Sequence, residues 1–168
     1  MPLSMHQATA PVFLQVLGAL SSVLDKAQAH AAAKKIDPAV LIAARLAPDM
    51  FPLAKQVQLT CDFAKGAMSR LAGVDVPSWA DTEKTFEELK ARITKTIDYV
   101  ESFRSAQIDG SEQREVKITV AGTPIGFRGQ VYLQHFLLPN LYFHATAAYV
   151  ILRHNGVELG KRDFMGAA

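Results

Sequence analysis

The sequence predicts a mainly α-helical protein in which four antiparallel helices carry a small β-hairpin between the third and the fourth. Apolar residues recur at steps of three and four over long stretches, which is typical of amphipathic helices. A period of two replaces this spacing between Arg114 and Arg128 and predicts the hairpin. The length of 168 residues suits one domain spanning residues 1–168.

The first helix is expected from Ser4 to about Ala33. Its apolar stripe consists of Phe13, Leu17, Leu20, Leu24 and Ala27. Pro11 lies one turn in, so either the helix begins there or the residues before it form a kinked first turn. On a continuous helix, His6 would point inward. Asp37–Pro38 then predicts the cap and first turn of a short helix that runs to about Leu46.

The second and third helices are separated by a loop. The run 47–52 contains two prolines and predicts a break, after which the second helix should extend from Leu53 to a C-cap at Gly73. Either Ser78 or Asp81 is expected to cap the third helix. The long connection between these helices is one known variant of four-helix topology.

The fourth helix follows the hairpin and carries an internal proline. It is expected to begin near Gly129 or Gln130 and to be kinked or divided at Pro139, whose ring clashes with the carbonyl four residues earlier. Asn155–Gly156 predicts its C-cap, and the tail 157–164 is expected to lie back on the helices.

Composition argues against several classes of protein. A net charge of +2 without a dense basic cluster does not favour nucleic-acid binding. Neither a secretory signal nor an apolar run of ~20 residues is found, so we expect a cytoplasmic protein without a membrane partner. The single cysteine, Cys61, allows no internal disulfide and fits a reducing compartment.

Five segments resemble an uncharacterised bacterial family, a domain of unknown function within the DinB-like four-helix-bundle superfamily. They are residues 4–8, 47–53, 61–65, 138–144 and 151–164. The resemblance runs from end to end and implies a DinB-like antiparallel four-helix bundle.

Many DinB-like proteins hold a divalent metal on three histidines, and several use it in thiol-dependent transfer or isomerisation. The resemblance places His144 at one of these positions, Asn140 at another, and Gln56 near the third. Amide oxygens bind zinc or nickel far more weakly than imidazole does. This degenerate set therefore makes a poor metal site.

A rebuilt metal site could instead draw on His6, Asp49, His135 and His144, a sensible ligand set for zinc, nickel or iron. On a straight helix His135 and His144 point in opposite directions, so they could converge only if Pro139 redirects the segment. The alternative is that each histidine makes a structural hydrogen bond. We favour this alternative because no fixed ligand spacing is present.

A site without metal is a further hypothesis. His144 could act as a base, with Asp49 orienting it and Tyr142 or Tyr149 as proton donors. The simpler interpretation of the two tyrosines is packing with solvated hydroxyls. Asn140 is expected to satisfy a carbonyl freed by the proline rather than to bind a ligand.

Two functions from different classes remain open. The first is a small-molecule-binding protein or metal-dependent enzyme, with His144 and His135 in a polar pocket at the end where the first helix begins. The second is a non-catalytic structural or interaction protein, a homodimer with a vestigial metal pocket. Small side chains would permit its close helix contacts: Ala145, Ala147 and Ala148.

Overall fold

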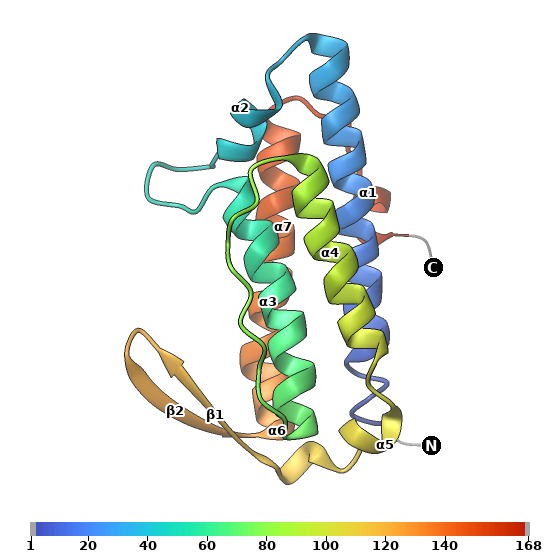
Figure 1. Cartoon of the computed structure of the whole chain (residues 1–168), viewed down its shortest axis with the longest axis vertical. Helices are drawn as coiled ribbons and strands as arrows, with labels where there is room; N and C mark the ends of the chain where they lie inside the picture. The colour runs from blue at the N-terminus through green and yellow to red at the C-terminus, as the bar shows by residue number, and fades with distance from the viewer. Residues whose placement is uncertain (1–2, 167–168) are drawn as a thin grey trace.

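The computed structural model describes residues 3–166, and four long helices lie side by side within them (Figure 1). They are α1 (Ala10–Lys34), α3 (Leu53–Ala72), α4 (Phe86–Glu101) and α7 (Leu138–His154). The shorter helices are α2 (Pro38–Ala43), α5 (Ser105–Ile108), α6 (Gly129–Val131) and α8 (Lys161–Met165). The protein is mainly helical, with one small antiparallel sheet.

The connection between the second and third long helices sets their directions. Segment 73–85 returns along the length of α3 before α4 begins, so α3 and α4 run parallel to each other (Figure 1). Helices α1 and α7 run in the opposite direction, so the expectation of four antiparallel helices holds for α1 with α4 and for α3 with α7 but not for α3 with α4. The tail also returns to the helices, because α8 packs on α1 and Lys26 pairs with Asp163 at 2.6 Å.

The first helix begins at Ala10, with Pro11 in its first turn, and residues 5–9 before it form a hydrogen-bonded turn, so both expected features are present. Proline fits there because the amide at a helix start has no intrahelical partner. The expected cap of α2 is present, since Asp37 Oδ1 accepts a hydrogen bond from the Ala39 amide at 2.9 Å. Gly73 ends α3 as expected, with a φ of 74° that favours glycine.

The cap of α4 differs from both expected residues. Thr85 accepts from the Glu88 amide, while the Glu88 carboxylate accepts from the Thr85 amide, which forms a capping box. Asp81 is unavailable because it pairs with Lys55 at 2.6 Å. The helix therefore starts later than the sequence indicated.

The predicted hairpin is formed by β1 (Glu115–Val120) and β2 (Thr123–Arg128), which pair antiparallel. Its turn residues, Ala121 and Gly122, both have positive φ, at 47° and 81°, as tight hairpin turns require. Val116 and Ile118 are buried on β1, whereas β2 is largely exposed and projects from the helices (Figure 1).

The irregularity expected at Pro139 takes the form of a π-helical stretch before it. Residues Tyr132–Leu137 continue α6 with wider turns, and the Leu138 amide donates to the Leu133 carbonyl, five residues back. Helix α7 then continues to His154, and Gly156 follows its C-cap Asn155 with a φ of 88°. Such π-type turns frequently mark functional sites.

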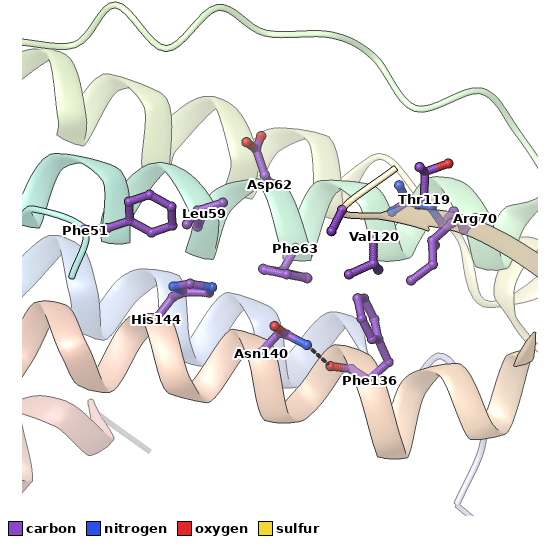
Figure 2. Close-up of a pocket in the computed structure, with 12 residues that line it drawn as sticks. Phe51, Leu59, Asp62, Phe63, Arg70, Thr119, Val120, Phe136, Asn140 and His144 are labelled. Carbon is purple, nitrogen blue, oxygen red and sulfur yellow. Dashed lines mark hydrogen bonds between the residues drawn. The ribbon is translucent and has the colours of Figure 1, made fainter. Parts of the chain in front are cut away.

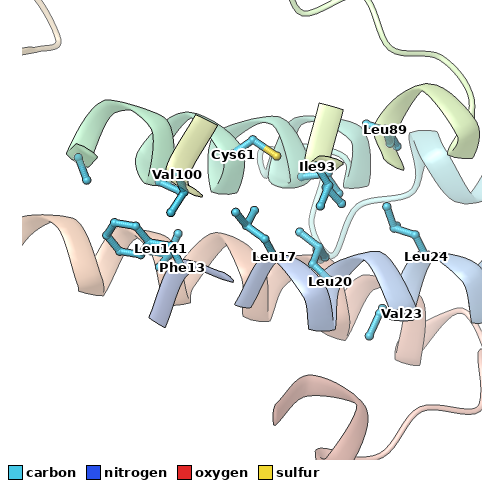
Figure 3. Close-up of a cluster of buried hydrophobic side chains, with 14 of the residues drawn as sticks. Phe13, Leu17, Leu20, Val23, Leu24, Cys61, Leu89, Ile93, Val100 and Leu141 are labelled. Atoms are coloured by element: carbon cyan, nitrogen blue, oxygen red, sulfur yellow. The ribbon is translucent and has the colours of Figure 1, made fainter. Parts of the chain in front are cut away.

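The four long helices share one apolar core (Figure 3). Its largest fully buried members include Phe13, Leu17, Leu24, Leu89 and Ile93. Cys61 lies in this core, where burial raises the pKa of its thiol to about 12. The thiol is therefore protonated and inert at neutral pH. Between residues 3 and 166, every helix is too short or too polar to cross a membrane.

Candidate functional site

A groove of about 580 Å³ lies between α3, α7 and the end of β1 (Figure 2). This volume is within the range of small-molecule sites. Its walls are mainly apolar, formed by Phe51, Leu59, Phe63, Ile118, Val120 and Phe136. Its polar side chains are Asp62, Arg70, Thr119, Asn140 and His144.

Helical spacing explains why these side chains face one another. Residues seven apart lie on one side of α3, and they are Gln56, Phe63 and Arg70. Residues four apart share one side of the π-helical stretch and α7, and they are Phe136, Asn140 and His144. Since α3 packs against α7, Phe63 and Arg70 form a wall opposite the second row, while Gln56 is buried and does not line the groove.

A chain of hydrogen bonds fixes the protonation of His144. The Gln56 Nε2 donates to the Phe51 carbonyl at 3.2 Å, so its Oε1 faces the imidazole. That oxygen lies 2.7 Å from His144 Nδ1 and can only accept. Nδ1 therefore carries the proton, and Nε2 carries the lone pair.

The surroundings of His144 keep its ring neutral. The side chain is only 8% exposed, stacks on Phe63 at 5.4 Å, and meets Phe143 edge-on at 5.2 Å. This burial, assisted by the positive charge of Lys55, lowers the pKa of His144 below 6.5. Within residues 3–166 no group bonds its Nε2, so the groove contains an open, unprotonated nitrogen.

Two other polar side chains of the groove, Asn140 and Asp62, form hydrogen bonds or ion pairs within the protein. Asn140 Nδ2 donates to the Phe136 carbonyl at 2.7 Å and so holds the backbone of the π-helical stretch. Asp62 pairs with Lys65 at 2.7 Å and with Arg92 at 3.0 Å. Both side chains thus have one polar atom bound within the protein, Asp62 through Oδ1 and Asn140 through Nδ2.

Comparison with other proteins identifies the family. A family model described as "Domain of unknown function (DUF1993)" matches residues 5–165. The chain belongs to the DUF1993 family. A crystal structure of a DinB family member protein from Shewanella denitrificans shares 40% identity with it, at a TM-score of 0.87. The match covers 97% of this chain and 92% of that chain. No curated protein matches this DUF1993 chain.

The four residues expected to form a metal site do not come together in this DUF1993 protein. His135 and Asp49 are exposed, and neither lines the groove. His6 lies at the other end of α1 from the α2 connection, where its amide donates to Asp109 Oδ1 at 2.8 Å. The π-helical stretch does not turn His135 toward His144. Among residues 3–166, no three His, Cys, Asp or Glu side chains could jointly hold a metal ion.

The three superfamily positions do not fit a divalent metal either. Gln56 Oε1 and His144 Nδ1 are hydrogen-bonded to each other, and Asn140 Nδ2 donates to the Phe136 carbonyl. One imidazole with two amides offers no anionic ligand and only one nitrogen donor suited to zinc or nickel. Gln56 and His144 instead form a hydrogen-bonded pair, and Asn140 bonds to the backbone of the π-helical stretch.

The residues expected to assist His144 in proton transfer lie elsewhere. Tyr142 is 42% exposed and lies outside the groove. The Tyr149 hydroxyl reaches the Leu159 carbonyl at 3.5 Å, and its ring packs edge-on against Phe164. Gln56, rather than Asp49, orients the imidazole.

Sequence reasoning missed Phe63, Arg70 and Phe136 as groove residues. The signal was available for the first two, because their spacing from Gln56 repeats every seven residues along α3. This row of Gln56, Phe63 and Arg70 lies beside the apolar stripe of α3, and it would have indicated that a second side of the helix faces a site.

Proposed function

We propose that this protein is a DinB-like four-helix bundle that binds a small molecule in the groove. The ligand has an aromatic or otherwise apolar body and a hydrogen-bond donor, such as a hydroxyl, that faces His144 Nε2. The observation that carries the proposal is the chain from the Phe51 carbonyl through Gln56 to His144, which leaves one acceptor open among aromatic walls. Binding sites commonly combine apolar walls with few, precisely oriented polar groups.

The same geometry would let His144 take a proton from the bound group, because a neutral imidazole can act as a base. The expected donors and orienting acid are not beside it, so the proposal concerns binding first. A metal has no part in it.

The test compares 2-naphthol with naphthalene, which differ only in the hydroxyl. Fluorescence titration of the wild-type protein should show the naphthol binding about tenfold more tightly, the effect of one hydrogen bond of about 1.4 kcal/mol. His144→Phe keeps an aromatic ring for stacking but has no nitrogen, so this preference should disappear while naphthalene affinity remains.

His154→Phe is the matched control, since His154 is exposed near the end of the same helix. It should retain the wild-type preference for 2-naphthol. Absence of binding by either compound, or an unchanged preference in His144→Phe, would refute the proposal.

A second candidate function is self-association, and exposed apolar residues on α7 favour it. Phe143 is 57% exposed, Tyr142 42% and Val150 36%, and these residues border a hollow of about 360 Å³ with Leu46 and Met50. Contiguous exposed apolar surface is typical of protein interfaces. We propose that a second copy of this chain covers it, with Ala147 allowing close approach.

Sedimentation velocity tests this candidate. The wild-type protein should sediment as a dimer and Phe143→Glu as a monomer, because a carboxylate buried in an apolar interface is costly. Val40→Glu is a suitable control, since Val40 is 58% exposed on a different helix. A wild-type monomer at all tested concentrations would eliminate homodimer formation.

A further inference from the structure

Arg70 lies in a notch on its own helix. Its guanidinium folds back over Gly66, and a Cβ at Gly66 would collide with Arg70 Nη1. Glycine is unfavourable in a helix interior, yet here it lies in the middle of α3. The missing side chain leaves the space that the guanidinium occupies, and this places Arg70 along the groove wall.

A buried phenol holds the guanidinium from the other side. Arg70 Nη1 donates to the Tyr132 hydroxyl at 3.3 Å. Tyr132 is fully buried and its ring stacks on Phe136 at 5.9 Å, so this anchor has little freedom. Burial raises the pKa of Tyr132, so the phenol stays neutral and does not cancel the charge of Arg70.

The charge of Arg70 has no carboxylate partner within the described residues 3–166. The one acid on the groove wall, Asp62, is already bonded to Lys65 and Arg92. A cation beside apolar walls, without a protein counterion, favours an anionic group on whatever occupies the groove.

From these contacts we infer that the ligand carries an anionic group, a carboxylate or a chemically similar oxyanion, that pairs with Arg70. This inference rests on the proposed function and narrows its ligand class. The ligand is elongated and apolar, with a hydrogen-bond donor at the His144 end and an anion at the Arg70 end. On α3, Gln56 lies beside His144 and Gly66 lies under the Arg70 guanidinium. These two positions are separated by roughly 15 Å of helix. After room for a hydrogen bond at each end, a two-ring molecule fits this span.

The experiment uses four probes that differ in these two groups: naphthalene, 2-naphthol, 2-naphthoate and 6-hydroxy-2-naphthoate. At neutral pH in low salt, the wild-type protein should bind 2-naphthoate at least about tenfold more tightly than naphthalene, as a charged hydrogen bond predicts. The probe with both groups should bind most tightly. Added salt should weaken binding of the naphthoates but not that of naphthalene.

Two variants separate charge from position. Arg70→Gln removes the charge and should abolish the carboxylate gain while naphthalene affinity persists. Gly66→Ala keeps the charge but displaces the guanidinium, so it should reduce the same gain without loss of helix content. Arg153→Gln, at an exposed arginine of α7, is the control and should behave as wild type.

Each outcome has one meaning. If naphthalene and 2-naphthol bind but the carboxylate adds nothing, the anion inference is wrong and the proposed function stands. If the carboxylate gain persists in Arg70→Gln, the anion binds elsewhere and the inference is also wrong. If no probe binds, both the proposed function and this inference fail. An unchanged gain in Gly66→Ala would overturn the role of the notch.

Discussion

The two sides of α3 differ in whether their polar side chains have partners within the protein. On the side facing segment 73–85, Arg92 is buried and bonds to Glu83, Asp62, Asp81 and the Ala80 carbonyl, each at 3.0 Å. Burial opposes its charge, but the hydrogen bond to Glu83 and the nearby carboxylates raise the pKa of Arg92. We call these four side chains the Arg92 cluster.

On the groove side, His144 Nε2 and the charge of Arg70 have no such partners among residues 3–166. Ion pairs within the protein connect the returning segment 73–85 to the helices, although the buried Arg92 Nε has no partner among residues 3–166. Polar groups left open are available to another molecule.

The largest expected effect is on the Arg92 cluster. Arg92→Met leaves three carboxylates without their shared cation and should lower the free energy of unfolding by about 3–5 kcal/mol. Urea denaturation measures this loss, and naphthalene binding under folded conditions should remain. Arg153→Met should change stability by less than about 0.5 kcal/mol. A loss below about 1 kcal/mol in Arg92→Met would show that the cluster does not hold segment 73–85.

A smaller effect should distinguish the groove side by its pH dependence. The pKa of His144 is 6.5 in the unfolded chain and lower in the folded protein, so the unfolded chain binds the proton more readily. The free energy of unfolding is therefore highest above the pKa of His144 in the unfolded chain, and it declines as pH falls below that pKa. Urea denaturation between about pH 7.5 and pH 5 should therefore show a steeper loss for wild type than for His144→Phe. Equal slopes would contradict a depressed pKa.

The smallest effect should come from Lys55, which connects the two regions. It pairs with Asp81 at 2.6 Å and also lowers the pKa of His144. Because this pair is partly exposed, Lys55→Gln should cost less than about 1 kcal/mol. NMR titration of the His144 ring should show a higher pKa in this variant. Lys34→Gln, at an exposed position of α1, should leave that titration unchanged.

Local signals predicted most of the helix ends. Asp37 and Gly73 cap their helices through contacts with their own neighbours, which the sequence displays directly. The predicted cap of α4 was wrong because Asp81 pairs with Lys55 of α3 and with Arg92, which lies within α4 itself. A side chain that the sequence predicts as a helix cap can therefore be engaged in an ion pair instead, and only the tertiary structure shows this.

The site was predicted only in part for the same reason. The resemblance placed Gln56, Asn140 and His144 together, and in the structure Gln56 of α3 bonds to His144 of α7, while Asn140 and His144 both line the groove. Spacing could not show that Gln56 orients the imidazole or that Arg70 folds over Gly66, since both depend on how α3 and α7 face each other. His6, Asp49 and His135 were proposed from metal-ligand chemistry alone, and none of them lines the groove with His144.

The π-helical stretch Tyr132–Leu137 has an evolutionary consequence. A π-type turn is equivalent to one extra residue inserted into an ordinary α-helix. Loss of one residue there would restore regular helix and rotate everything before it by roughly 100° relative to α7. The hairpin precedes this stretch and closes the groove beside Phe136. Relatives that differ by a single deletion at this place would keep the four long helices yet present a groove of different shape.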